Sequence, residues 1–355
     1  MREQWNKLAQ ILVNYSVRVQ PGDKVLITMM ETETLDLVRE CYKEIVKAGG
    51  LPQVEFQSAY LEKELMTYGN DAQLDWIPEL NYYGMEWADC YIGLRGARNP
   101  AEFAEVKSGA IAKHKKAMGI VSAKRIEATR WVLVRVPNES FAQQTGRSLD
   151  NMMDFFFSST NRDWEKEAAE YYRIQKVFQA ADEVRIVGKE TDLTLRTKGR
   201  IYAVGDGHVN MPDGEIYTSP LDDSANGKIY FEFPGVWAGQ YVHGIRLEFK
   251  DGKVVKASSE TNQDFFKTVL EMDEGATRLG EFAVGVNYGV TDFCGDILFD
   301  EKIGGTIHIA LGRAYAECAG INQSALHWDL IKDMRQEGEI YLDGKKVFEK
   351  GKLLI

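Results

Sequence analysis

Histidine and carboxylate side chains recur in the second half of this chain, within segments whose apolar residues alternate as in a β-strand. In IGGTIHIALG, His308 shares a face with Thr306 and Ala310, while isoleucine and leucine occupy the opposite face. The small neighbours leave space in front of the imidazole. In LHWDL, His327 and Asp329 point the same way, because residues two apart on a strand share a face. Imidazole nitrogens and carboxylate oxygens are the ligand types that divalent metals use.

Two further segments each offer a glutamate on the face opposite their aliphatic residues. GEFAVGVN presents Glu281 opposite Phe282 and Val284, and DGEIYTSP presents Glu215 after a Pro-Asp-Gly turn. A single glutamate on a strand is usually solvated, and a single histidine is usually a hydrogen-bonded core residue. Four segments with such side chains favour one shared site for one or two divalent metals. The spacing by itself leaves both interpretations open.

The elements that must position these residues fall into two kinds. In the first half, the strands 24–30 and 52–57 flank a helix that starts near residue 35, and 88–96 and 130–136 follow as strands. A β-α-β order implies a right-handed crossover and a parallel sheet, so we expect an open α/β domain. It contains neither GxGxxG nor GxxxxGK[ST], so no nucleotide site is predicted. We expect this domain to contribute substrate or dimer contacts at most.

The pattern changes after a helix at 164–181. Short segments with period two follow, separated by Asp-Gly and Gly-Gly turns, and only 262–272 is clearly helical. A mainly antiparallel β-rich domain is therefore predicted. Single cores stop growing beyond roughly 250–300 residues, so two domains are expected, at 1–180 and 181–355.

Composition excludes several classes of function. The chain of 355 residues has 54 acidic and 43 basic residues, a net charge of −11, which argues against nucleic-acid and anionic-membrane partners. No stretch approaches the roughly 20 apolar residues of a membrane span. The N-terminus resembles an amphipathic helix and not a signal peptide. The four cysteines form no CxxC pair, which argues against a disulfide framework or a thiolate zinc site, and we expect a cytoplasmic location.

Four ordered motifs make the chain similar to a known family. VNMPDGEIYTSP, RLGEFAVGVN, ILFDEKIGGTIHIALGRAY and SALHWDL together resemble the aminopeptidase T / aminopeptidase S family of thermophilic metallo-aminopeptidases. The resemblance implies an N-terminal α/β domain, a C-terminal β-rich domain with a dinuclear metal site, and a cytoplasmic homodimer. It also places the family's metal ligands on Glu215, Glu281, His308, His327 and Asp329. The family's active-site tyrosine matches Tyr315, as a ligand or an oxyanion contact.

The expected reaction is removal of the N-terminal residue, an apolar one, from short peptides. Two divalent ions (zinc, cobalt or manganese) activate a water for attack on the scissile carbonyl. In this scheme the free α-amine of the peptide ligates one metal, Glu281 moves the proton, and Tyr315 donates to the developing oxyanion. Weaker candidates for supporting contacts are His208, His243 and a bond from Asp300 or Glu301 to a ligand imidazole; Glu301 and Lys302 otherwise look structural.

Two alternatives remain from other classes. An iron-dependent ring-cleaving dioxygenase similar to the dihydroxypyridine dioxygenases shares the expected fold and uses a single iron with fewer ligands. A metal-free binding protein on the same scaffold is the other. The presence of both Glu215 and Glu281 favours two metals and hydrolysis.

Overall fold

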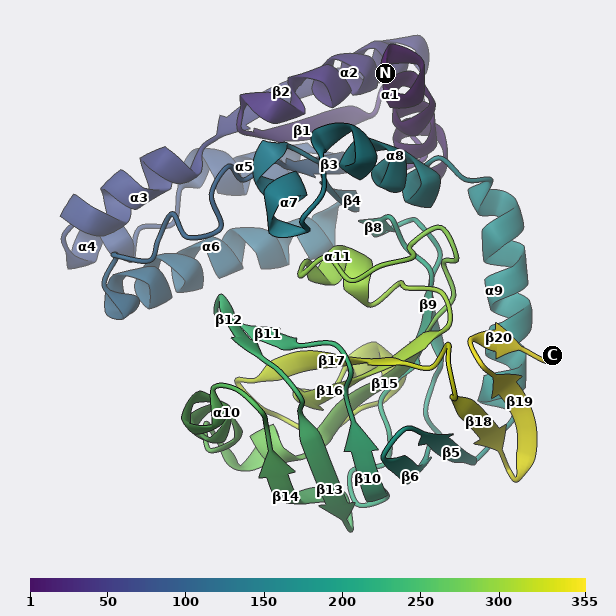
Figure 1. The fold of residues 1–355 in the computed structure, drawn as a ribbon. Coiled ribbons are helices and arrows are strands. Elements are labelled where there is room, and N and C mark those ends of the chain that lie inside the picture. Colours follow the sequence, from purple (N-terminus) through teal and green to yellow (C-terminus); the bar gives the residue numbers. More distant parts are fainter. The chain divides into compact units, whose positions relative to one another are not determined.

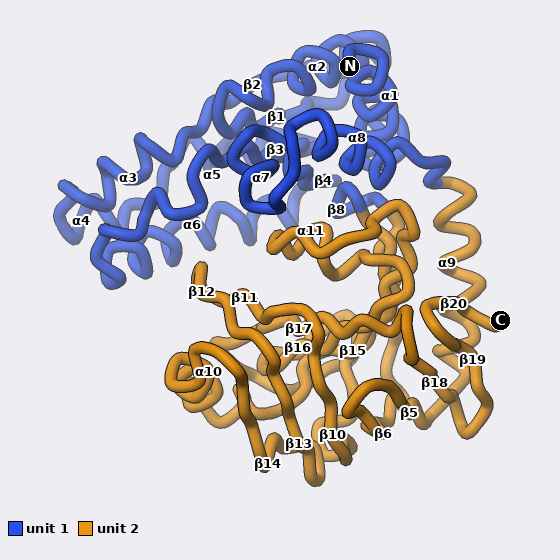
Figure 2. The backbone as a smooth tube through the Cα atoms, viewed as in Figure 1, with its two compact units in different colours: residues 1–164, 207–212 blue, residues 165–206, 213–355 orange.

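The computed structural model describes all 355 residues and separates into two compact units. Unit 1 contains Met1–Trp164 and Gly207–Pro212, and unit 2 contains Glu165–Asp206 and Asp213–Ile355 (Figure 2). Helix α9 (Trp164–Gln179) thus lies almost wholly in unit 2, whereas the division near residue 180 assigns it to the first domain. No helix combines the length and the apolar composition that a membrane span requires.

Unit 1 is built on a five-stranded parallel sheet in the order β2-β1-β3-β4-β8 (Figure 1). The predicted β-α-β crossover and parallel sheet are confirmed. Its strands are β1 (Lys24–Met30), β2 (Leu51–Gln57), β3 (Cys90–Arg95), β4 (Arg130–Arg135) and β8 (Asn210–Met211). Its helices are α1 (Arg2–Gln10), α2 (Leu35–Lys47), α3 (Ala59–Tyr68), α4 (Asp71–Leu74), α5 (Glu79–Trp87), α6 (Ser108–Ala128), α7 (Glu139–Gln144) and α8 (Leu149–Thr160).

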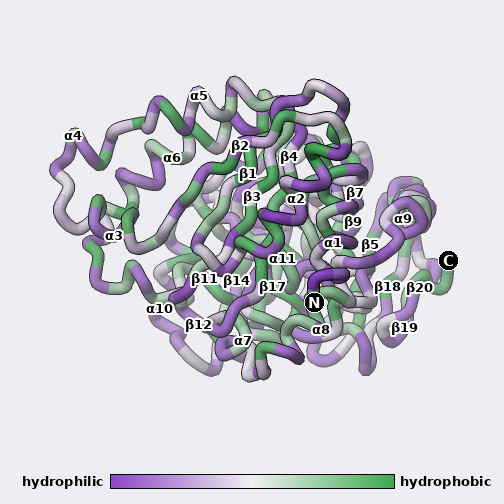
Figure 3. The backbone as a smooth tube through the Cα atoms, turned by 90° about the horizontal axis from the view of Figure 1, so that it is seen from above, coloured by the Kyte–Doolittle hydropathy of each residue, from purple (hydrophilic) through white to green (hydrophobic).

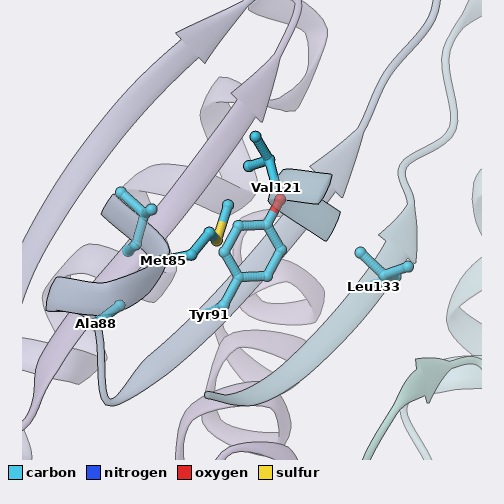
Figure 4. Packing of buried hydrophobic residues seen from close by; sticks show 6 residues of the cluster. Met85, Ala88, Tyr91, Val121 and Leu133 are labelled. Carbon is cyan, nitrogen blue, oxygen red and sulfur yellow. The ribbon is translucent and has the colours of Figure 1, made fainter. Parts of the chain in front are cut away.

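Helices cover both faces of this sheet, because right-handed crossovers that run in opposite directions along the sheet lie on opposite faces. The crossover from β1 to β2 runs one way, and the crossover from β2 back to β3 runs the other way. Helix α2 packs on one face, and α5 and α6 pack on the other. Under α5 and α6 a core cluster includes Met85, Tyr91, Val121 and Leu133 (Figure 4). The strands are therefore apolar on both sides, and hydrophobic segments gather around β1, β3 and β4 (Figure 3).

Unit 2 contains three antiparallel sheets, which confirms the predicted β-rich class. An eight-stranded sheet has the order β14-β13-β10-β6-β5-β18-β19-β20, a hairpin pairs β11 with β12, and a five-stranded sheet has the order β17-β16-β15-β9-β7. The strands are β5 (Glu183–Gly188), β6 (Thr191–Arg196), β7 (Ala203–Gly205), β9 (Glu215–Thr218), β10 (Asn226–Tyr230), β11 (Gly235–Trp237), β12 (Gln240–Val242), β13 (Arg246–Lys250), β14 (Lys253–Ser258), β15 (Leu279–Gly285), β16 (Thr306–Gly312), β17 (His327–Asp333), β18 (Glu339–Leu342), β19 (Lys345–Glu349) and β20 (Lys352–Leu353). The helices besides α9 are α10 (Gln263–Leu270) and α11 (Ile297–Asp300).

The five-stranded sheet positions the candidate site. Every residue of its central strands β15 and β16 is buried, on both faces. The sequence pattern suggested an aliphatic core face and an open polar face. The structure places the polar face inside the protein as well, with His308 fully buried. Its ionisable groups are consequently held in a medium of low dielectric constant, where charge pairing has a strong effect.

Candidate metal centre

The five residues predicted as metal ligands lie on four neighbouring strands of one sheet. Strand β17 carries His327 and Asp329, β16 carries His308, β15 carries Glu281, and β9 begins with Glu215. Segments that are distant in the sequence are thus brought side by side by antiparallel pairing. The alternation read from the sequence is the reason: each side chain projects from the same face as its neighbours.

The register of the sheet brings the carboxylates close together. Ala310 of β16 pairs with Glu281 on one side and with Asp329 on the other. His308, two residues earlier, pairs with Ala283 on β15 and with Ile331 on β17, so a small side chain flanks the imidazole on the β15 side. A register shift between Leu279 and Glu281 precedes this point. Alanines on β15 and β16 therefore leave the space into which the ligand-type groups project.

Glu281 occupies the middle of the cluster. Its Oε1 lies 3.5 Å from His308 Nε2, and its Oε2 lies 3.4 Å from His327 Nε2. Glu215 Oε2 approaches His308 Nε2 at 3.3 Å, and Asp329 Oδ2 approaches His327 Nε2 at 3.7 Å. Two groups result, Glu215–Glu281–His308 and Glu281–His327–Asp329, each with ligand atoms within 4.8 Å of one another. A shared carboxylate between two such groups is the arrangement expected of a dinuclear site.

The donor atoms fit a cation. Glu215 Oε2, both ring nitrogens of His308 and Asp329 Oδ1 are buried and have no hydrogen-bond partner. A buried polar atom without a partner costs about 1–3 kcal/mol, so several in one cluster are unusual unless a ligand satisfies them. Divalent metals accept the lone pairs of these atom types.

The negative charges of the carboxylates in the cluster also favour binding of cations. Burial raises the pKa of Glu281, but the contacts with His308 and His327 outweigh burial and lower that pKa to about 2. Burial disfavours the charged form of His327, yet Asp329 and Glu281 raise its pKa to about 9. The pKa of His308 rises well above its ordinary value against burial, because Glu215 and Glu281 face it. In the metal-free protein, protonated imidazoles thus supply the positive charge that the carboxylates require.

His327 is oriented by the backbone and by Tyr315. Its Nδ1–H donates to the carbonyl oxygen of Arg313 at 2.7 Å, which leaves Nε2 directed at Glu281 and Asp329. The hydroxyl of Tyr315 lies 3.0 Å from the same Nε2. Tyr315 therefore belongs to the cluster by position.

Lys302 and Glu301 form a part of the site that the sequence analysis treated as structural. The Lys302 side chain is fully buried, and its Nζ donates to Glu215 Oε1 and to Glu301 Oε2, both at 2.6 Å. Burial would lower the pKa of Lys302, but the two glutamates raise it well above its ordinary value. The one signal in the sequence was a lysine directly before the apolar strand segment IGGTIHIALG.

The remaining candidates lie elsewhere. Asp300 accepts a hydrogen bond from the backbone of Cys294, and no hydrogen bond joins it or Glu301 to His308, so the suggested bond to a ligand imidazole does not form. His208 belongs to unit 1, where its ring lies 4.5 Å from that of Tyr15. His243 is exposed. Neither histidine is part of the two ligand groups.

Comparison with known proteins decides the family. A family model described as thermophilic metalloprotease (M29) matches residues 1–353. The chain belongs to the M29 metalloproteases. It is therefore a metal-dependent peptide hydrolase, as the four motifs predicted.

Proteins with curated names align with this M29 metalloprotease over most of their length. Aminopeptidase PepS of Streptococcus thermophilus is 24% identical, with 98% of this chain and 96% of that protein covered. Aminopeptidase T of Thermus aquaticus is 25% identical, with 89% and 86% covered. These relatives and the family match support hydrolysis over the other classes considered.

Solved structures confirm the fold of the M29 metalloprotease. Wild-type AmpT from Thermus thermophilus superposes with a TM-score of 0.89 at 22% identity, covering 100% of both chains. The 2,5-dihydroxypyridine dioxygenase from Pseudomonas putida KT2440 superposes with a TM-score of 0.65 at 14% identity, covering 100% of this chain and 98% of that one. Fold alone does not separate the two chemistries.

Proposed function

We propose that this chain is a dinuclear metallo-aminopeptidase in which Glu281 would contribute to both metal positions. One position uses Glu215, Glu281 and His308, and the other uses Glu281, His327 and Asp329. The observation that carries the proposal is the pair of overlapping ligand groups that share Glu281. Its two oxygens face different imidazoles, so each has its own partner group.

The charge balance supports two divalent ions. Glu215, Glu281 and Asp329 supply three negative charges, while Glu301 and Lys302 offset each other. When bound, the metals supply a nucleophilic hydroxide at neutral pH and polarise the scissile carbonyl. The hydroxide adds a fourth negative charge. Zinc, cobalt and manganese all accept this set of oxygen and nitrogen ligands.

Lys302 is proposed as a positioning residue. Its ammonium occupies Glu215 Oε1 at 2.6 Å, which directs Oε2 towards His308. The Glu215 carboxylate is therefore oriented before a metal binds. Glu301 keeps the lysine charge compensated on its other side.

Tyr315 is proposed to donate a hydrogen bond to the oxyanion that develops on the scissile carbonyl. Burial, together with the charges of Glu281 and Asp329, raises the pKa of Tyr315 far above its ordinary value, so the hydroxyl keeps its proton. A fixed donor in a buried site is effective in this role. The proton-transfer role assigned to Glu281 stays a prediction.

The proposed substrate is inferred from the relatives, which are named aminopeptidases. We propose a peptide with a free α-amine as substrate, and an apolar N-terminal residue as the preferred one. The cytoplasmic location also stays a prediction.

We also propose that two copies of the chain assemble as a homodimer. Helices α3 and α5 expose large apolar side chains, which is typical of an interaction surface. These are Tyr60, Leu61, Tyr68, Leu80 and Tyr83. Light scattering coupled to gel filtration tests the assembly, and replacing Leu61 and Leu80 by glutamate is expected to give monomers.

The decisive experiment combines metal analysis with turnover. We expect two metal ions per chain after loading with zinc, cobalt or manganese, and hydrolysis of Leu-p-nitroanilide. N-acetyl-Leu-p-nitroanilide is the matched control, because it lacks the free amine and should resist hydrolysis. One iron per chain with oxygen uptake on 2,5-dihydroxypyridine would instead favour a dioxygenase and overturn the proposal.

A further inference from the structure

Unit 1 contains a cavity of about 210 Å³ between its sheet and helices α5 and α6. The floor is formed by Thr28 of β1, by Gly93 of β3 and by Leu133 of β4, while Met85 and Val121 project from the helices. Figure 4 shows Met85, Tyr91, Val121 and Leu133 around this part of the core. Since a water molecule takes about 30 Å³ of liquid, the space suits a small organic molecule.

The cavity lies where the topology of the sheet changes direction. From β1 the chain runs to β2 on one side, then crosses back to β3 on the other side of β1. Open α/β sheets bind ligands at the carboxyl ends of strands beside such a switch point. The cavity reaches these ends, because Met30 closes β1 and Arg95 closes β3.

Two polar groups at the cavity have unused hydrogen-bonding capacity. Thr28 is 3% exposed, and its hydroxyl has no hydrogen-bond partner. The Nε of Arg125 on α6 is also buried without a partner. Arg125 is held in place, since its guanidinium lies 5.4 Å from the ring centre of Tyr91 and 4.4 Å from that of Trp131. A fixed cation and a buried hydroxyl together can bind an anionic oxygen.

The side chains that line the cavity include two arginines, Arg95 and Arg125, and no aspartate or glutamate. Burial lowers the pKa of Arg125, Tyr91 opposes this shift, and the like charge of Arg95 adds a smaller lowering effect. Two other polar residues of the lining already have a partner, because the side-chain amides of Gln57 and Asn81 both donate to Glu55 Oε1.

We propose that this cavity binds a small carboxylate that carries an apolar body. The carboxylate contacts Arg125 and the Thr28 hydroxyl, and the methionine, valine and leucine side chains of the wall contact the apolar part. The proposal concerns residues of unit 1 only and does not depend on the metal centre of unit 2.

The test uses the metal-loaded, full-length enzyme and ligand-detected NMR titration with 4-methylpentanoate up to about 10 mM. We expect saturable binding, and the neutral 4-methylpentanol should bind at least tenfold more weakly. The same titration is repeated with leucine. Tighter binding of leucine would identify the ligand as an amino acid, and tighter binding of 4-methylpentanoate would identify it as a simple carboxylic acid. Absence of saturable binding, or equal binding of the alcohol, overturns the proposal.

Variants separate this cavity from the metal centre. Arg125→Met should weaken 4-methylpentanoate binding roughly tenfold or more, whereas Glu281→Gln should leave it unchanged. Thr28→Val should weaken binding and at the same time raise the thermal midpoint of the ligand-free protein, because it removes a buried hydroxyl that has no partner. Thr28→Ser is the matched control that keeps the hydroxyl and the binding. Binding that survives both Arg125→Met and Thr28→Val places the ligand elsewhere and contradicts the assignment.

Discussion

The ammonium of Lys302 lies 2.6 Å from Glu215 Oε1, although 87 residues separate the two in the chain and the lysine side chain is fully buried. A buried ion pair contributes little if both partners are absent, but breaking it leaves an uncompensated charge. The same contact therefore stabilises the metal-free protein and holds Glu215, one of the proposed metal ligands, in position.

Replacement of Lys302 by methionine should destabilise the metal-free protein by about 3–5 kcal/mol, because Glu215 and Glu301 lose their shared partner in the interior. Urea unfolding of the chelated protein measures this change. The double variant Lys302→Met/Glu301→Gln is the control and should recover part of the loss. Equal stability of Lys302→Met and the parent protein would show that the pair has no such role.

Glu281→Gln should lower kcat/KM for Leu-p-nitroanilide at least about 100-fold while the fold is retained, because an amide cannot bridge two cations. Circular dichroism checks the fold and mass spectrometry checks the metal content. Glu248→Gln on β13 is a matched control at an exposed site and should behave as the parent protein. Full activity of Glu281→Gln would remove Glu281 from the mechanism.

Tyr315→Phe distinguishes an oxyanion donor from a metal ligand. If the hydroxyl acts as donor, kcat should fall about 10²–10³-fold with the metal content and KM nearly unchanged. Loss of one metal ion per chain would instead identify Tyr315 as a ligand. Steady-state kinetics and metal analysis on the same sample give the answer.

Metal affinity should rise with pH up to about 9, because binding requires neutral imidazoles and the pKa of His327 is raised to about 9 in the metal-free protein. Below that pH, affinity should fall by about tenfold per pH unit for each proton displaced. The stability of the metal-free protein should change in the opposite direction. A folded-state pKa above the unfolded value stabilises at low pH, and this contribution is lost as the pH rises from about 6.5 to about 9. Competition titrations with a chelator and urea unfolding at several pH values measure both trends, and a pH-independent affinity would contradict the first.

Much of the site was readable because period-two alternation is local. His308, His327 and Asp329 lie on strands whose apolar residues alternate clearly, so their common face followed from spacing. Which strands become neighbours is not a local property, and the family resemblance supplied that step. The pairing of Glu281 and Asp329 with Ala310 depends on a register that only the folded sheet defines.

Other features were not readable, each for a physical reason. Lys302 was taken as structural because its partners Glu215 and Glu301 define its role only after folding. The strand sequence KVLITMM did not indicate the cavity beside Thr28, because a cavity depends on which helices cover the strand after folding.

Ala310 lies between the two acidic residues Glu281 and Asp329 in the sheet. Each of these residues belongs to a strand adjacent to that of Ala310, so about 4.8 Å separates the backbones on either side. The spacing between the backbones that carry Glu281 and Asp329 is thereby set by the hydrogen-bonded strands of the sheet. Loops around the sheet can therefore change in length and composition without changing the spacing between the strands that carry Glu281 and Asp329.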